Sequence, residues 1–299
     1  MSNSPFFSLI IPSYNRAGFI AKAIQSATQQ TFSSIQIIVI DDGSTDNTND
    51  VVASLNLPNL QYYKTENAER AAARNFGVSK ATGQYITFLD SDDYLLPNHF
   101  EVAYRFIQAQ NNPAIFYQPN NFVDANGKVT HPHKKIKDDV TRALIVEGNL
   151  MSCIGVFLRN EIAQTFKFNT DRALSGTEDH ELWLRIAAHH TILYNRVVTS
   201  CMVQHDSRSV MAVNDATLIK RLQLFVYYMK QNQQFIARYK NLLPAMEAQA
   251  WSYLSLHFAL TGKHKKQAIH FFTKAVRTYP PFIFQKRCAA IIKQLLLNN

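Results

Sequence analysis

The sequence predicts an α/β fold, a mainly parallel mixed sheet flanked by helices, followed by an all-helical C-terminal segment. Short apolar strands alternate with amphipathic helices over residues 8–89, as in sheets built from strand–helix–strand units. Polar side chains follow directly after three of these strands. From about Asp215 onward every segment has helical spacing.

Buried strands are expected where β-branched and aromatic residues cluster. The first of them ends at Pro12, and Asn15 is expected to cap the helix that follows. The four strands of this part cover residues 8–11, 35–40, 60–63 and 85–89. The later helices begin near Thr45 or Asp46 and at about Ala68, the second ending near Lys80.

The alternation is less regular beyond Asp93. A polar stretch at 124–138 is expected to be a loop or hairpin, because Asn126-Gly127 is a turn signal. The remaining expected elements are helices at 97–110 and 178–190 and strands at 114–118, 154–158, 191–194 and 196–203. The spacing at 251–280 resembles half of a tetratricopeptide-type helical pair. Only one such unit is visible, so a helical appendage and not a repeat array is expected.

The length of 299 residues suits one large domain and a smaller one, which we place at 1–214 and 215–299. The three cysteines are far apart, which argues against a disulfide framework or a structural zinc site. The N-terminus lacks the pattern of a secretion signal, and no apolar run approaches the length of a membrane span. We therefore expect a cytoplasmic protein.

The net charge of +9 is unevenly distributed along the chain. Residues 216–299 hold 13 Lys and Arg against one acid, Glu247. Helices of this kind suit an anionic membrane surface, so a peripheral location at the inner face of the membrane is one expectation. The alternative is a helical segment docked on the first domain with its charges in solvent. No nucleic-acid-binding module is found, so nucleic acid is not an expected partner.

Three carboxylates, Asp90, Asp92 and Asp93, follow the strand at 85–89 within four positions. Such closely spaced like charges call for a compensating cation, and carboxylate oxygens are preferred ligands of Mg2+ and Mn2+. The alternative is a solvated acidic turn before the next helix. Tyr14 and Asp42 follow two other strands, and in open α/β sheets the carboxyl ends of the strands form the binding edge. The sequence therefore predicts a site at this edge.

Five sequence blocks within residues 8–209 together resemble the family 2 glycosyltransferases, enzymes of the GT-A fold. The blocks are Ile11–Arg16, Val39–Asp46, Ala73–Gly77, Phe88–Asp93 and Glu178–Trp183. The resemblance implies an inverting transfer from a nucleotide-diphosphate sugar, a UDP-sugar, to a hydroxyl acceptor such as a growing glycan or a lipid-linked saccharide. It also implies a role in polysaccharide biosynthesis.

The resemblance implies a role for each matching residue. The expected donor-binding residues are Pro12, Tyr14, Asn15, Arg16, Asp42, Arg74, Asp90, Ser91 and Asp92. The expected ligands of a divalent cation, Mn2+ or Mg2+, are Asp92, Asp93 and His205. Asp179 is the expected general base, and Glu178 is expected to orient the acceptor. The alternatives are a loop histidine at 205 and helix-dipole charges at 178 and 179.

Physical chemistry gives these assignments their reasons. Asp42 can accept a hydrogen bond from the imide N–H of uracil, and Tyr14 can pack against the base. Carboxylates alone would repel a diphosphate, so a cation is expected to bridge them and to stabilise the leaving group as a Lewis acid.

Two other functions fit parts of the pattern. A nucleotidyltransferase on a related sheet would carry a Gly-rich, basic phosphate-binding stretch near the N-terminus, where this chain has Pro12–Arg16. A scaffold with a silent sugar-nucleotide pocket is the non-enzymatic alternative, and the presence of Asp42, Asp92 and Asp179 argues against it.

Overall fold

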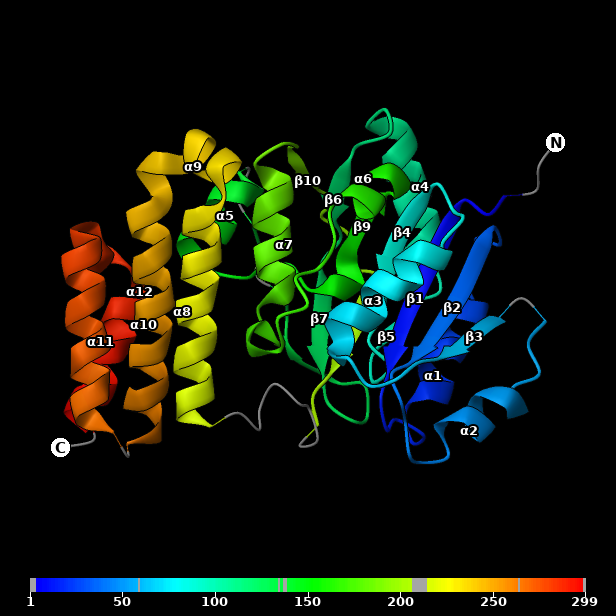
Figure 1. Cartoon of the computed structure of the whole chain (residues 1–299), viewed down its shortest axis with the longest axis horizontal. Helices are drawn as coiled ribbons and strands as arrows, with labels where there is room; N and C mark the ends of the chain where they lie inside the picture. The colour runs from blue at the N-terminus through cyan, green and yellow to red at the C-terminus, as the bar shows by residue number, and fades with distance from the viewer. Residues whose placement is uncertain are drawn as a thin grey trace.

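Seven of the described strands form the central sheet, in the order β10-β6-β9-β4-β1-β2-β3 (Figure 1). This computed structural model describes residues 4–58, 60–133, 135–136, 139–205, 214–262 and 264–297. Neighbouring strands run parallel, except that β9 is antiparallel to β4 and β6. The strands are β1 (Phe7–Ser13), β2 (Ile35–Asp41), β3 (Leu60–Lys64), β4 (Tyr85–Phe88), β6 (Ile115–Tyr117), β9 (Val156–Arg159) and β10 (Ile192–Tyr194). The predicted α/β fold is confirmed.

Strand β1 continues through Pro12 to Ser13, so the expected end of this strand at Pro12 is wrong. The register explains why proline is tolerated there. Pairing with β4 ends where Ile10 lies opposite Phe88, and the carbonyl of Ile10 accepts from Leu89 N–H. Pro12 faces the same side two residues later, beyond the end of β4. Its missing N–H therefore removes no bond of the sheet.

Alternate residues of the strands face two hydrophobic layers. Ile10 and Ile38 belong to one layer, and Leu9 and Val39 belong to the other. The first layer is covered by α3 (Glu69–Lys80), α5 (Val140–Glu147), α6 (Asn160–Thr165) and α7 (Glu178–Ala187). The second is covered by α1 (Ile20–Thr28), α2 (Thr48–Ser54) and α4 (His99–Ala109). The apolar runs of the central strands reflect burial on both faces.

A smaller sheet in the order β5-β11-β7-β8 lies beside the carboxyl ends of the central strands. Its strands are β5 (Tyr94–Leu95), β7 (Asn120–Val123), β8 (Val129–His131) and β11 (Ser200–Val203). The antiparallel pair β7–β8 confirms the expected hairpin, and Gly127 takes the positive φ of 81° that its turn requires. Residues 134, 137 and 138 of the expected loop lie outside the described residues.

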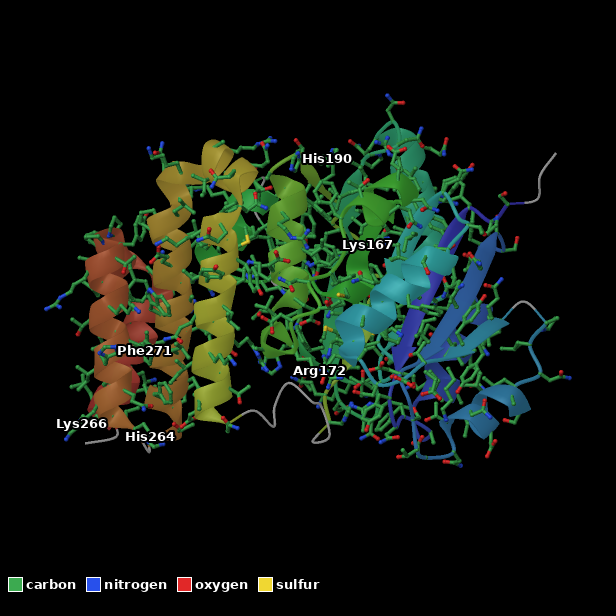
Figure 2. All side chains as sticks on the ribbon, viewed as in Figure 1. Lys167, Arg172, His190, His264, Lys266 and Phe271 are labelled. Carbon is green, nitrogen blue, oxygen red and sulfur yellow. The ribbon has the colours of Figure 1, made fainter. Side chains whose placement is uncertain are left out.

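The C-terminal segment is helical, as predicted, and its long helices stand side by side at one end of the molecule (Figure 1). Figure 2 shows Phe271 on the helix at this end, and the ring of Phe271 stacks on those of Trp251 and Phe258 in the neighbouring helix. The helices at 243–261 and 265–278 therefore pack against each other, within the helical appendage expected from the sequence. The elements are α8 (Asp215–Gln231), α9 (Gln233–Tyr239), α10 (Leu243–Thr261), α11 (Lys265–Thr278), the 3-10 helix η4 (Pro280–Phe284) and α12 (Lys286–Leu297).

The C-terminal helices share a hydrophobic cluster with the central sheet. This cluster runs from Ile10 in β1 through Trp183 in α7 to Phe225 in α8 and Ile291 in α12. The ring of Phe225 stacks on His180 of α7 with a centroid distance of 4.7 Å. The division into domains at 214/215 coincides with the start of α8 and stays a prediction.

Candidate active site

A cleft of about 1080 Å³ opens at the carboxyl ends of β1, β2 and β4. Because these strands are parallel, the residues that follow them meet at one edge of the sheet. Every donor-binding residue that the sequence predicts lines this cleft, and so do His205, Glu178 and Asp179. The predicted residues brought together are Pro12, Tyr14, Asn15, Arg16, Asp42, Arg74, Asp90, Ser91, Asp92, Glu178, Asp179 and His205.

Two further parts of the fold contribute to the walls of the cleft. Strand β9 runs against its neighbours, so its amino end lies at the edge where β1 and β4 end, and this places Ser152 and Cys153 in the cleft. The smaller sheet and the residues after β11 add Phe122, Met202 and Gln204. None of these five residues was predicted from the sequence.

Asn15 organises the loop after β2 and does not cap helix α1, so the predicted N-cap role is wrong. Its side-chain oxygen accepts from Thr45 N–H at 2.9 Å, and its own N–H donates to Ser44 Oγ at 2.9 Å. Its φ of 51° lies in the left-handed region, which asparagine tolerates well. Helix α1 begins five residues later, at Ile20. Asn15 thereby joins the ends of β1 and β2 at the rim of the cleft.

Asp42 is buried at the end of β2 and also lines the cleft. Its Oδ1 accepts from Ala68 N–H at 2.8 Å. Burial raises the pKa of Asp42, and hydrogen bonds from the backbone N–H groups of Ala68 and Glu69 oppose that rise. The neighbouring Asp41 is turned away, because it accepts from Ser44 N–H and from the hydroxyl group of Tyr62. Of these two carboxylates, Asp42 is the one presented to a ligand.

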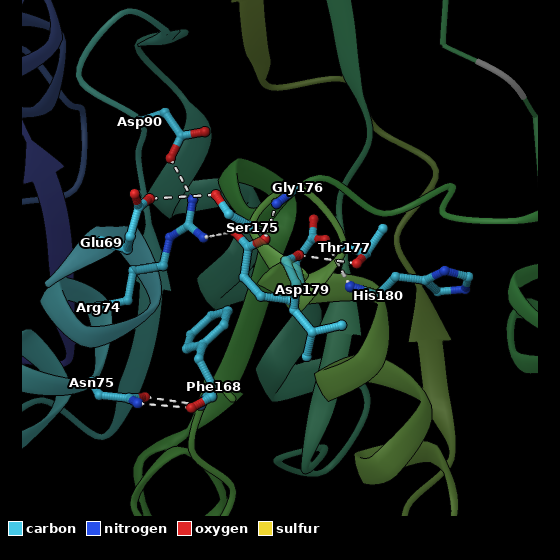
Figure 3. A network of polar contacts seen from close by, with 12 residues as sticks. Glu69, Arg74, Asn75, Asp90, Phe168, Ser175, Gly176, Thr177, Asp179 and His180 are labelled. Carbon is cyan, nitrogen blue, oxygen red and sulfur yellow. Dashed lines mark hydrogen bonds and ion pairs between the residues drawn. The ribbon is translucent and has the colours of Figure 1, made fainter. Parts of the chain in front are cut away.

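Arg74 forms the centre of a buried ionic network between α3, the end of β4 and α7 (Figure 3). One terminal nitrogen of Arg74 lies 2.7 Å from Asp90 Oδ1, and the other lies 3.0 Å from Glu178 Oε1. The guanidinium also lies over the ring of Phe168. Glu178 accepts a second bond from Gly176 N–H at 2.5 Å. This network fixes the first turn of α7 against the sheet.

Asp92 and His205 meet across the cleft, with 3.1 Å between Asp92 Oδ2 and His205 Nε2. The imidazole of His205 stacks on the ring of Phe19 at a centroid distance of 4.8 Å. Arg16 Nε lies 3.8 Å from the same Asp92 oxygen. Within the part of the chain that the structure describes, no group of three or more His, Cys, Asp or Glu side chains is arranged to hold a metal ion. Asp92 and His205 form a pair of candidate ligands.

Asp93 differs from the other predicted ligands, because it is buried and does not line the cleft. Its Oδ1 accepts from Val203 N–H at 2.9 Å, which ties the loop after β4 to β11. The metal-ligand role of Asp93 stays a prediction.

Asp179 lies in the first turn of α7, at the floor of the cleft. Its pKa is raised to about 7: burial is the largest cause and the charge of Glu178 adds to it, whereas Arg74, Asn149 and the N–H of His180 act in the opposite direction. Asn149 donates to Asp179 Oδ2 at 2.9 Å. A carboxylate with this pKa can accept a proton near neutral pH.

The sequence reasoning missed Asn67, Glu69 and Arg70, which line the cleft after β3. Asp42 was identified because it follows the carboxyl end of a strand. The same pattern applies to these three residues, since β3 is parallel to β2 and ends at the same edge. Asn149 could not be identified by this pattern, because it follows helix α5 and not a strand.

The family model described as glycosyl transferase family 2 matches residues 8–163. The chain is 29% identical over 202 residues to an uncharacterized glycosyltransferase of Rickettsia bellii, and the match covers 65% of the chain. The chain spans 29% of the length of that relative. It is also 29% identical over 218 residues to the Escherichia coli UDP-Glc:alpha-D-GlcNAc-diphosphoundecaprenol beta-1,3-glucosyltransferase WfgD, with 72% of the chain and 82% of WfgD covered.

Two solved structures share the fold at low sequence identity. A fragment of S. aureus TarS in complex with UDP-GlcNAc superposes with a TM-score of 0.70 at 17% identity, covering 98% of the chain and 90% of the fragment. The mannosyltransferase PcManGT of Pyrobaculum calidifontis, in complex with GDP-Man and Mn2+, gives a TM-score of 0.54 at 19% identity, covering 98% and 87%.

The substitution Arg74→Met should destabilise the fold by about 3–5 kcal/mol, because it leaves the buried carboxylate of Glu178 without its ion-pair partner. Urea unfolding measures this change. Removing that carboxylate too, in Arg74→Met/Glu178→Gln, should recover part of the loss. The control is Lys80→Met at the exposed end of the same helix, with a change below about 1 kcal/mol. A loss for Arg74→Met no larger than this control would contradict the structural role of the network.

Proposed function

Since the chain belongs to glycosyl transferase family 2, we propose that it transfers a sugar from a UDP-sugar to a hydroxyl group of an acceptor, with inversion at the anomeric carbon. The observation that carries this proposal is the gathering of Asp42, the Asp92–His205 pair and Asp179 in one cleft. A nucleotidyltransferase would need a phosphate-binding loop after β1, where Pro12–Arg16 stands.

Recognition of the donor starts at the ends of β1 and β2. Asp42 is positioned to accept a hydrogen bond from the imide N–H of uracil, and Tyr14, which is 46% exposed, offers its ring for stacking on the base. Arg16 lies beside Asp92, where it can pair with a phosphate oxygen. The UDP-GlcNAc bound by TarS, a structure of the same fold, supports a uridine nucleotide as the donor.

The side chains present fit a divalent cation, Mn2+ or Mg2+. Asp92 and His205 supply one carboxylate oxygen and one imidazole nitrogen, and diphosphate oxygens and water would fill the other positions, as is usual for nucleotide sites. When bound there, the cation would neutralise the charge that the leaving diphosphate gains. Mn2+ in the PcManGT complex supports this assignment.

Asp179 acts as the general base in the proposed reaction. The acceptor oxygen bonds to the anomeric carbon as the bond from that carbon to the diphosphate oxygen breaks, and the electron pair leaves with the nucleoside diphosphate. The hydroxyl proton passes to Asp179 as the new bond forms. Asn149 holds the carboxylate in place, and the Arg74 network holds the helix turn that carries it. Glu178 is assigned to the acceptor side, where its ion pair with Arg74 holds the start of α7 in place.

We further propose a lipid-linked or growing glycan as the acceptor and polysaccharide biosynthesis at the cytoplasmic face of a membrane as the setting. The diphosphoundecaprenol acceptor in the name of the E. coli relative supports the lipid-linked class. None of the described helices is long and apolar enough to cross a bilayer. Contact with an anionic membrane is assigned to η4 and α12, where the exposed Phe284 and Leu296 stand beside Lys286 and Lys293.

The variant Asp179→Asn should bind UDP-sugar normally but lose about 10²- to 10⁴-fold in turnover, because the amide cannot take the acceptor proton. UDP release measures turnover, and calorimetry measures donor binding. The control is Asp171→Asn, whose carboxylate caps a short 3-10 helix outside the cleft and whose turnover should stay near that of the wild type. Near-normal turnover of Asp179→Asn would eliminate it as the base.

The pH profile provides a second measurement on the same residue. Asp179 must be ionised to act, so kcat/KM should fall about tenfold per pH unit below its pKa of about 7 and level off above it. The residual activity of Asp179→Asn should lack this acid limb. If the variant keeps the same fall of kcat/KM at low pH, that fall reports the titration of another group.

Removal of the metal should weaken UDP binding, and Asp92→Ala or His205→Ala should abolish most of the enhancement by Mn2+, about tenfold or more. Calorimetric titration of UDP with Mn2+ or with EDTA measures this effect. Asp93→Asn is the matched control from the same loop, and we expect it to keep the enhancement. Loss of the enhancement in Asp93→Asn would restore Asp93 as the ligand expected from the sequence.

The double variant Lys286→Ala/Lys293→Ala should bind phosphatidylglycerol vesicles on the order of 30-fold more weakly, at about 1 kcal/mol per cation. Co-sedimentation measures this binding, with phosphatidylcholine vesicles for comparison. Tyr227→Ser, at an exposed aromatic of α8, should bind like the wild type. Wild-type protein that fails to sediment with the anionic vesicles would remove the membrane from the proposal.

A further inference from the structure

Arg221 is a buried cation on α8, in the C-terminal helical segment, and only 7% of it is exposed. Its Nε is buried without a hydrogen-bond partner among the residues that the structure describes. Burying an unpaired charge costs several kcal/mol, so buried arginines are normally held by carboxylates or other acceptors. This feature calls for an anion that the chain does not supply from its described residues.

The guanidinium lies against Gly176, a residue that lines the cleft. A Cβ added to Gly176 would stand 2.8 Å from one terminal nitrogen of Arg221 and 3.1 Å from its Cζ. Gly176 also has a φ of 97°, which favours glycine. The loop is therefore shaped so that Arg221 can approach the backbone three residues before Asp179. Arg221 thus packs against the cleft wall at Gly176 and is not itself a lining residue.

The carboxylate whose charge acts on Arg221 is already engaged. Glu178 pairs with Arg74 and accepts from Gly176 N–H, so it attracts Arg221 without bonding to it. Arg70, which lines the cleft, lies close enough for its positive charge to act on Arg221. Burial lowers the pKa of Arg221, and the like charge of Arg70 adds to this effect. Two guanidinium groups within electrostatic range of each other favour an anion between them.

We propose that Arg221 and Arg70 form a subsite for a phosphate group carried by the acceptor. The proposal rests on the proposed function and narrows the acceptor to a saccharide with a phosphate or diphosphate near its reacting hydroxyl. Guanidinium groups suit phosphate because they bind it through two parallel N–H···O bonds. The donor diphosphate is assigned elsewhere, beside Asp92 and His205. The subsite therefore recognises a second anionic group.

The test is a calorimetric titration of the full chain with inorganic phosphate in the presence of saturating UDP and Mn2+, which occupy the donor site. Arg221→Gln should bind phosphate at least about tenfold more weakly than the wild type, since a hydrogen-bonded charge contributes about 1.5–3 kcal/mol. The matched control is Lys220→Gln, the adjacent exposed cation on α8, with unchanged affinity. Equal phosphate affinity in Arg221→Gln and the wild type would overturn the proposal, and so would a wild-type protein that does not bind phosphate.

A second titration without UDP separates this proposal from the proposed function. If UDP fails to bind, the donor assignment fails. A loss of phosphate affinity caused by Arg221→Gln would still support the subsite, and the absence of such a loss would overturn it.

Thermal unfolding distinguishes a ligand-binding role from a packing role. If Arg221 serves to bind an anion, the ligand-free Arg221→Met variant should unfold at the same or a higher temperature than the wild type, because an unpaired buried charge is removed. Phosphate should then raise the midpoint of the wild type and leave that of the variant unchanged. A variant that is less stable than the wild type and equally stabilised by phosphate would overturn the proposal.

Co-sedimentation identifies the source of the phosphate. Arg221→Gln should bind phosphatidylglycerol vesicles as the wild type does, because Arg221 packs against Gly176 and does not belong to the exposed face of η4 and α12. Weaker vesicle binding by Arg221→Gln would instead assign Arg221 to lipid headgroups and would overturn its role in the acceptor site.

Discussion

The ion pairs of Arg74 are the constraint on which the cleft depends. They join a helix on one face of the sheet to the carboxyl end of β4 through Asp90 and to the start of α7 through Glu178. A buried guanidinium that pairs with carboxylates on two sides fixes the direction of these partners as well as their distance, because its nitrogens lie in one plane. Asp179 follows Glu178 in the chain and so takes its position from this network. The position proposed for the catalytic Asp179 thus depends on the ion pair between Arg74 and Glu178.

The lining of the cleft mixes acidic and basic side chains. Its charged residues include Asp42, Asp90, Asp92, Glu178 and Asp179 together with Arg16, Arg70 and Arg74. In the proposed function a diphosphate would approach these carboxylates only with a cation to offset the repulsion. The proposed subsite of Arg70 and Arg221 would give a phosphate of the acceptor a separate positive position.

The sequence predicted most of the sheet, and polar residues that come directly after apolar strands led to Asn15, Asp42 and Asp92 in the cleft. Arg74, Glu178, Asp179 and His205 were expected from the resemblance to the family. The contribution of Cys153 could not be predicted, since the reversal of β9 places its amino end at the site. Spacing alone could not separate Asp92 from Asp93, because their different directions depend on pairing with His205 and Val203. Likewise, the contact of Asn149 with Asp179 arises only from tertiary packing.

One contact links the last helix to the candidate base. Arg287 of α12 donates to the carbonyl of Glu147 at 3.0 Å, two residues before Asn149, which in turn holds Asp179. A chimera that exchanges the C-terminal helices between relatives would therefore alter the support of the carboxylate as well as the surface of the protein.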